Sequence, residues 1–158
     1  MATDDNVIIF LGAKVLGNVS FGKGCSVWYN AVMRGDKEII VGDNCNIQDC
    51  CIFHSDSHIT TLGNNVTVGH GAIVHGATIG DNVLVGMGSI ILDGATIGNN
   101  CFIAAGSLVT GKTKAPDGSF LMGSPAKIVR SVSKTDVQQI ENSWQTYKKE
   151  SEEYRNNL

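Results

Sequence analysis

The sequence predicts an all-β solenoid, and both its composition and a six-residue repeat indicate this fold class. Nineteen of the 158 residues are glycine, only two are proline, and aromatic residues make up 6% of the chain. A large apolar residue also recurs with a period of six. A sustained period of this kind is typical of a parallel β-helix, in which each hexad forms one short strand and one corner. The sixteen residues that lead the hexads are Val15, Phe21, Val27, Met33, Val41, Ile47, Phe53, Leu62, Val68, Val74, Ile79, Val85, Ile91, Ile97, Ile103 and Val109.

Three hexads make one triangular coil of 18 residues, so the leading residues are shared among three faces. We label the faces a, b and c in rotation, with Val15 on face a. The period is interrupted at three places. The interval Met33–Val41 has two additional residues, the interval Phe53–Leu62 has three additional residues, and the interval Val74–Ile79 lacks one residue. The leading side chains should point into the prism. Glycine and small residues should fill the corners, where a bulky Cβ would clash.

All four histidines lie between positions 54 and 75, and the face assignment brings two of them together. His54 and His75 each follow the leading residue of a hexad on face a. They are 21 positions apart, which is one coil of 18 plus the three additional residues. They therefore occupy the same place on neighbouring coils, about 4.8 Å apart at the backbone. Two zinc-bound nitrogens in a tetrahedral shell lie about 3.3 Å from each other, a separation that stacked imidazoles can reach with small ring tilts.

His70 belongs to a different face. It follows the leading residue of a hexad on face c by two positions and shares its column with Asp49. Outward directions on faces c and a diverge by roughly 120° in a three-sided prism, so His70 should not reach His54 and His75 of its own chain. In a homotrimer around a threefold axis, face c of one copy meets face a of the next, and each seam would hold three histidines. The fourth histidine, His58, lies among the additional residues, and we interpret it as a loop residue.

After residue 132 the apolar pattern becomes helical. A 3-4-3-4 spacing predicts one face of an amphipathic helix, with Ser133 or Thr135 as the residue that caps its start. The sequence therefore predicts a β-helix domain over residues 1–132 and a helix over residues 133–158 that packs along it. The residues on the helical face are Val137, Ile140, Trp144, Tyr147, Ser151, Tyr154 and Leu158.

Charge and composition exclude several classes of partner. The net charge of −3 and the pI of about 5.7 are unsuited to nucleic acid or to an anionic membrane surface. No apolar run approaches the roughly 18 residues of a membrane helix, and the acidic start predicts no signal peptide. Five cysteines, an odd number, predict reduced thiols in a cytoplasmic protein. Cys50 and Cys51 should face opposite ways along a strand, one inward and one outward.

Four segments resemble the gamma-class carbonic anhydrases over nearly the whole chain: "SVWYNAVMRGD" (26–36), "NIQDCCIFH" (46–54), "VGHGAIVHG" (68–76) and "GSPAKIVR" (123–130). The resemblance implies a left-handed β-helix with a C-terminal helix, and a homotrimer with a metal at each subunit interface. It implies that His54, His70 and His75 bind zinc, or alternatively iron, and that the protein catalyses the reversible hydration of CO2 to bicarbonate. It also implies that Gln48 and Asn46 line the site and orient bound water or bicarbonate.

The same resemblance carries over further parts of the site. Tyr147 matches a tyrosine that the family places near the metal. Arg34 and Asp49 would form an ion pair across the subunit boundary, with Asp36 nearby. The face assignment agrees with this pairing, because Arg34 lies on face a and Asp49 on face c.

The sequence departs from the best-studied type of this class in its acidic residues. That type carries glutamates that transfer protons, one directly after the aspartate of the "RGD"-like motif and one in an acidic loop. Here Lys37 stands at the first position, and the loop is the short "SDSHIT". Asp56 or His58 would have to substitute, and the departure implies weak hydration activity.

Two functions other than CO2 hydration remain open at this point. Hexapeptide acyltransferases share the repeat and a tail like "GSPAKIVR", and they use one histidine as a general base at a subunit seam. A trimeric scaffold with a vestigial metal site is the other alternative. The histidine spacing favours the metal enzyme, because an acyltransferase has no need for two histidines in one column and a third across a seam.

Overall fold

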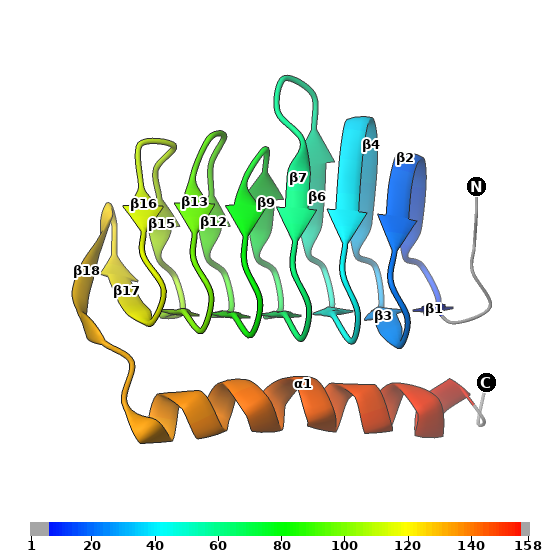
Figure 1. Ribbon diagram of the computed structural model, residues 1–158. Coiled ribbons are helices and arrows are strands. Elements are labelled where there is room, and N and C mark those ends of the chain that lie inside the picture. Colours follow the sequence, from blue (N-terminus) through cyan, green and yellow to red (C-terminus); the bar gives the residue numbers. More distant parts are fainter. Residues whose placement is uncertain (1–6, 156–158) are drawn as a thin grey trace.

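The computed structural model describes residues 7–155 and shows a parallel β-solenoid with one C-terminal helix (Figure 1). The coils stack along one axis, and the helix lies along the stack. The fold class predicted from the hexad repeat is confirmed. Residues 1–6 at the start of the predicted β-helix domain, and 156–158 at the end of the predicted helix, including Leu158, lie outside the described residues.

Face c is a sheet of eight strands. Its strands are parallel except the last, β18, which pairs antiparallel with β17. In the order in which they lie side by side, the strands are β1 (Val7–Ile9), β3 (Cys25–Val27), β5 (Asn46–Ile47), β8 (Thr67–Val68), β11 (Leu84–Val85), β14 (Phe102–Ile103), β17 (Ser119–Gly123) and β18 (Ala126–Ser131).

Faces a and b form one continuous sheet, because two long strands run through the corner between them. The long strands are β2 (Lys14–Phe21) and β4 (Val32–Val41). The shorter strands of face a are β6 (Ile52–Ser55), β9 (Ile73–His75), β12 (Ile90–Ile91) and β15 (Leu108–Val109). Those of face b are β7 (Thr60–Leu62), β10 (Thr78–Ile79), β13 (Thr96–Ile97) and β16 (Lys114–Ala115).

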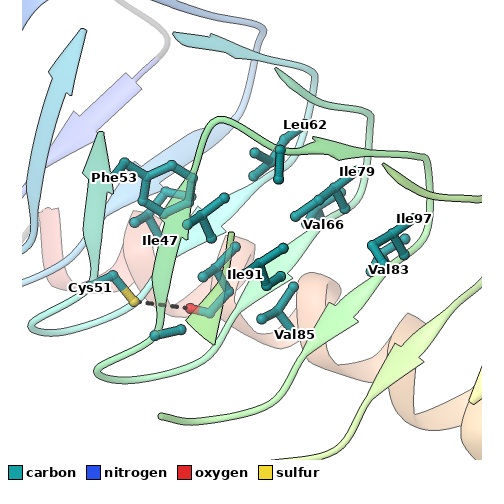
Figure 2. Close-up of a cluster of buried hydrophobic side chains, with 14 of the residues drawn as sticks. Ile47, Cys51, Phe53, Leu62, Val66, Ile79, Val83, Val85, Ile91 and Ile97 are labelled. Carbon is teal, nitrogen blue, oxygen red and sulfur yellow. Dashed lines mark hydrogen bonds between the residues drawn. The ribbon is translucent and has the colours of Figure 1, made fainter. Parts of the chain in front are cut away.

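The strand register agrees with the predicted faces. On face a, Phe53 pairs with Met33 on one side and with Val74 on the other. Fourteen of the sixteen leading residues are buried, and the remaining two, Val15 and Phe21 of the first coil, are partly buried. Figure 2 shows the result in the middle of the prism, where leading side chains from all three faces pack against one another.

The interruptions of the hexad period have two structural outcomes. The two additional residues between Met33 and Val41 are absorbed into β4, which continues through the corner. The three additional residues between Phe53 and Leu62 form the loop between β6 and β7, which projects beyond the neighbouring corners in Figure 1. This loop, residues 56–59, lies next to the strand that carries His54.

The corner between faces b and c is built from asparagine, a feature that the expectation of glycine and small residues missed. Asn44, Asn65, Asn82 and Asn100 adopt left-handed φ values of 55°, 58°, 54° and 55°. Asparagine tolerates this conformation better than other side chains with a Cβ. The Nδ2 group of each of the first three donates to Oδ1 of the next, over 3.0, 3.0 and 3.2 Å, so the amides form a ladder along the corner.

All five cysteines are free, in agreement with the predicted thiols. Cys51 is buried and Cys50 is exposed, as expected. The reason differs from the expected alternation along a strand, because Cys50 lies in a corner with a left-handed φ of 59°. Its side chain is therefore directed outward by the turn.

Helix α1 (Lys134–Arg155) covers face c and runs from β18 back toward β1 (Figure 1). Its buried Ile140 packs against Leu84 and Phe102 of face c. Not every residue of the predicted helical face is covered, since Val137 and Tyr154 remain about half exposed. Within residues 7–155 no helix has the length and apolar character needed to cross a membrane.

A reciprocal cap starts the helix. Of the two predicted caps, Ser133 has this role: the N–H of Asp136 donates to Ser133 Oγ over 3.2 Å, and the N–H of Ser133 donates to Asp136 Oδ2 over 2.6 Å. Thr135 lies inside the first turn. Arg130 of β18 donates to both carboxylate oxygens of Asp136, so the cap also ties the helix to the sheet.

This cap predicts a pH-dependent contribution to stability. The hydrogen bonds from Arg130 and Ser133 hold the pKa of Asp136 well below its ordinary value. A carboxyl whose pKa is lower in the folded state stabilises the protein above its unfolded pKa of about 4, and this stabilisation is lost as the pH falls through the folded pKa. We expect Asp136→Asn to lower the free energy of unfolding at pH 7 by about 1–3 kcal/mol. Thermal melts from pH 7 to pH 3 check this, since the difference between the two proteins should narrow as the pH falls below about 4; a constant difference would contradict the assignment.

Candidate metal centre

Face a brings His54 and His75 together at the same place on neighbouring coils. β6 and β9 pair in parallel with His54 opposite His75, as the residue count predicts. The ring centroids are 4.7 Å apart, and His54 Nδ1 lies 2.8 Å from His75 Nε2. Arg34 lies in the same column one coil earlier. These residues border a hollow of about 270 Å³ on face a, together with Val32, Ile52 and Phe53.

Carboxylates contact the outer nitrogens of both rings. Asp93 Oδ1 lies 2.9 Å from His75 Nδ1, and Asp36 Oδ2 lies 2.8 Å from His54 Nε2. Hydrogen bonding to His54 and the charge of Arg34 hold the pKa of Asp36 below its ordinary value. Arg34 Nη2 also approaches His54 Nε2, at 2.7 Å. A hydrogen bond to the Asp36 carboxylate needs a proton on His54 Nε2, whereas a hydrogen bond from the Arg34 guanidinium needs a lone pair on the same nitrogen. A single tautomer of His54 therefore cannot make both hydrogen bonds.

The arrangement fits a metal cation. With protons on His54 Nε2 and His75 Nδ1, the nitrogens that face each other at 2.8 Å both carry lone pairs. Two facing lone pairs repel unless a cation or a proton lies between them. Tetrahedral zinc with bonds of 2.0–2.1 Å separates two ligand nitrogens by about 3.3 Å, which a small tilt of the rings would provide. Hydrogen bonds from carboxylates to the outer nitrogens of metal-bound histidines are the usual means of fixing their orientation.

Asp93 was missed by the sequence analysis. It follows the leading residue Ile91 on face a by two positions and lies one coil beyond Gly76, the neighbour of His75. A Cβ on Gly76 would overlap the Asp93 carboxylate, so glycine is what lets the carboxylate reach His75. The residue count, continued one coil further, would have placed Asp93 opposite Gly76 and so only diagonal to His75.

His70 lies in the corner that follows β8 of face c and leads to face a, with a separate set of partners. Its Nδ1 is 2.9 Å from Asp49 Oδ2, in the predicted column. The backbone N–H of His70 donates to Gln48 Oε1 over 3.1 Å, and Gln48 Nε2 donates to Asn46 Oδ1 over 3.2 Å. Asn46 in turn donates to Thr67 Oγ1 over 2.9 Å. The buried amides of Asn46 and Gln48 are thus held in a fixed orientation beside His70.

Tyr147 of α1 joins this second group. Its hydroxyl oxygen lies 3.2 Å from His70 Nε2. Its predicted place near a metal stays a prediction. Partial burial, aided by the charges of Glu150 and Asp49, raises the pKa of Tyr147, and the phenol keeps its proton at neutral pH. Gln48, His70 and Tyr147 line a hollow of about 250 Å³ between face c and the helix.

The predicted site residues therefore fall into two groups on two faces of the chain. His54, His75 and Asp56 have ligand atoms within 4.8 Å of one another, and His70 is not a member of that group. The predicted pair of Arg34 and Asp49 is not formed within one chain: Arg34 Nε lies 3.2 Å from Asp36 Oδ2, and Asp49 binds His70. The pair across subunits stays a prediction.

Comparison with known proteins identifies the family. A family model described as "Bacterial transferase hexapeptide (six repeats)" matches residues 76–111. A protein from Methanocaldococcus jannaschii named "Probable carbonic anhydrase" is 47% identical over 93% of this chain and 94% of its own length. The chain belongs to the gamma-class carbonic anhydrase family.

Other proteins similar to this chain differ in length and description. Gamma carbonic anhydrase 2, mitochondrial, from Arabidopsis thaliana is 41% identical over 91% of this chain, but the match spans only 55% of the plant protein. A crystal structure of a Bacillus cereus protein, provisionally described as an acetyltransferase, superposes with a TM-score of 0.95 at 38% identity, covering 98% of this chain and 91% of that one. The gamma-class fold is thus shared with proteins that carry transferase descriptions.

Proposed function

We propose that the protein is a metal-dependent carbonic anhydrase that works as a homotrimer with three sites at its subunit interfaces. The observation that carries the proposal is the division of the histidines: His54 and His75 converge on face a, and His70 is oriented separately at the corner after β8, where its side chain is 43% exposed. A neighbouring copy would supply His70 to complete a three-histidine site for zinc, or alternatively iron. These three histidines would hold the metal, and the chemistry that zinc would supply there is a lower pKa, of about 7, for a bound water, which would make a nucleophile available for CO2.

The chain's own residues would position the reactants. Asp93 and Asp49 hold the rings of His75 and His70 through their Nδ1 atoms, which leaves Nε2 of each ring for the metal. Gln48, tied to the backbone of His70 and to Asn46, presents its amide at the same seam and would orient water or bicarbonate. The carboxylate of Asp36 beside His54 would keep the ligating tautomer of that ring.

The outer surfaces of the three faces support a trimer that buries face a. The helix covers face c. The outward column of face b is mainly polar and consists of Ser20, Ile40, Thr61, Thr78, Thr96 and Lys114. The outward column of face a is aliphatic after its first residue and consists of Lys14, Val32, Ile52, Ile73, Ile90 and Leu108. Ile52 and Ile90 are 46% and 36% exposed, and an aliphatic column beside the histidine pair is typical of an interaction surface.

A charge on face a should therefore dissociate the trimer. We expect Ile52→Glu to convert the protein to monomers, because a carboxylate would be buried without a partner at the interface. Ile40→Glu, on the outward side of face b, is the matched control and should remain trimeric. Light scattering coupled to size-exclusion chromatography measures both masses. A trimeric Ile52→Glu, or a wild-type monomer, would refute the proposed assembly.

The proposed activity is tested by metal analysis of protein purified without air, followed by stopped-flow measurement of CO2 hydration. We expect about one zinc or iron per chain and a rate above that of buffer. Metal without hydration would favour a scaffold with a vestigial site, and a metal-free trimer would defeat the proposal.

The five free cysteines fit a reducing compartment, and we propose a cytoplasmic location on that basis.

An acyltransferase is the second candidate. The matched family model carries a transferase description, and the hollow beside His70 and Tyr147 offers a base with a phenol neighbour. This alternative predicts saturable binding of coenzyme A, which isothermal titration calorimetry measures. Stoichiometric metal with no coenzyme A binding would exclude it.

A further inference from the structure

We infer that Asp56 is a metal ligand, so that each protomer binds its metal through His54, His75 and Asp56 before a neighbouring copy contributes His70. The inference rests on the proposed metal site and changes its ligand set and its order of assembly. It assigns a role to the three additional residues between β6 and β7, which the proposed hydration mechanism leaves unused.

The loop that carries Asp56 is anchored beside the histidine pair. The Nζ of Lys37 donates to the carbonyl oxygen of Ser57 over 3.1 Å. The backbone N–H of Glu38 donates to Ser55 Oγ over 2.9 Å, and Thr60 Oγ1 donates to the carbonyl oxygen of His54 over 3.1 Å. The first end of the loop and its middle are thus fixed to β4 of the preceding coil, and its second end is fixed to the strand that holds His54. Lys37, which stands where the family's best-studied type has a glutamate, has a structural role here.

The position of Asp56 suits direct coordination. One ligand atom from each of His54, His75 and Asp56 lies within 4.8 Å of the others. The exposed Asp56 side chain can close the remaining distance by rotating, because among residues 7–155 its hydrogen bonds go only to the adjacent Ser57. Asp36 and Asp93, the other carboxylates near the pair, contact the outer ring nitrogens. Asp56 is therefore the carboxylate left to face the metal itself.

Two imidazoles and one carboxylate form a complete donor set. Zinc binds Asp or Glu oxygen at about 2.0–2.2 Å, and two histidines with one carboxylate occur both in catalytic zinc sites and in the facial triad of non-haem Fe(II) proteins. All three donors come from one chain here, so metal capture needs no partner. His70 of a neighbouring copy would then occupy one of the open positions when the trimer forms. The donor set suits Fe(II) as well as zinc.

Titration with Co²⁺ tests this ligand set without reference to activity. The proteins are the wild type, His70→Ala, and His70→Ala combined with Asp56→Asn. We expect His70→Ala to bind one Co²⁺ per chain, and the added Asp56→Asn to raise Kd by more than about 100-fold, beyond the 10–100-fold that loss of an outer partner causes. His70→Ala combined with Asp36→Asn is the matched comparison, and its Kd should exceed that of His70→Ala by no more than about 100-fold. The visible absorption bands of Co²⁺ should also change with Asp56→Asn in the wild-type background.

The outcomes separate this inference from the proposed function. If the wild type binds Co²⁺ and His70→Ala does not, Asp56 is not a third ligand and the three-histidine site stands. Equal Kd values for His70→Ala with and without Asp56→Asn would also overturn the inference. A wild type that takes up no metal would overturn the inference and the proposed function together. Circular dichroism of each variant shows that the solenoid is retained, which is expected because Asp56 and His70 lie on its outer surface.

Discussion

Replacing both His54 and His75 by alanine should abolish metal binding and lower kcat/KM for CO2 hydration by about 1,000-fold or more, which corresponds to roughly 4 kcal/mol or more of transition-state stabilisation. The two rings supply the only pair of imidazole nitrogens that converge within the described part of one chain, 2.8 Å apart. When both are removed, the metal can be bound only by His70 of a neighbouring copy, which Asp49 orients, and by at most one carboxylate. Metal analysis by atomic absorption and stopped-flow hydration assays measure the two losses.

The fold should survive this double substitution. Both histidines lie on the outer surface of face a, and their hexads are held by the buried Phe53 and Val74 on the inner side. Thr78→Ala, on the outward side of face b, is the control and should change neither metal content nor rate. If the double variant hydrates CO2 at the wild-type rate with the metal still bound, the centre lies elsewhere and the proposed site is wrong.

Truncation of one leading residue should have the largest effect on stability. Ile79 of β10 is 1% exposed and packs in the middle of the prism (Figure 2). We expect Ile79→Ala to reduce the free energy of unfolding by about 2–5 kcal/mol, because the coils above and below hold the cavity open. For a chain of this length that corresponds to a fall of roughly 4 to 20 °C in Tm.

A matched isoleucine on the same face serves as the control. Ile40 is 37% exposed and points outward, so Ile40→Ala should cost no more than about 1 kcal/mol. Thermal and urea unfolding of both variants give the comparison. Equal losses for the two isoleucines would mean that inward and outward positions are not distinguished by packing, against the assignment of the hexads.

Much of the fold follows from the sequence because a solenoid is a local structure. Each coil packs only on its neighbours, so the hexad count places Phe53 beside Met33 and Val74 without knowledge of distant contacts. The same count placed His54 opposite His75 and put His70 in one column with Asp49. It did not reveal the asparagine corner, because asparagine and glycine both adopt left-handed φ and the period does not distinguish them.

Counting hexads could not predict those contacts of the candidate site in which a side chain reaches from one column to the next. Asp93 and Asp36 contact the two histidine rings diagonally, from positions that the period does not align with them. Asp56 comes near the pair only because the loop between β6 and β7 is anchored there, and the conformation of an insertion is not set by the repeat. Tyr147 was placed by resemblance, and its contact with His70 depends on how α1 docks on face c.

The amino-acid order by itself determined the three faces, the inward residues and the separation of the histidines into two sets. Apolar side chains are buried with a fixed period, and this period assigns every other residue to a face and a column. Tertiary structure alone decided which carboxylates orient the rings, where the Asp56 loop lies and which faces stay uncovered. These features depend on side-chain reach and on docking of non-repeating segments. Such contacts are set by the packed three-dimensional surface, and a local period carries no information about them.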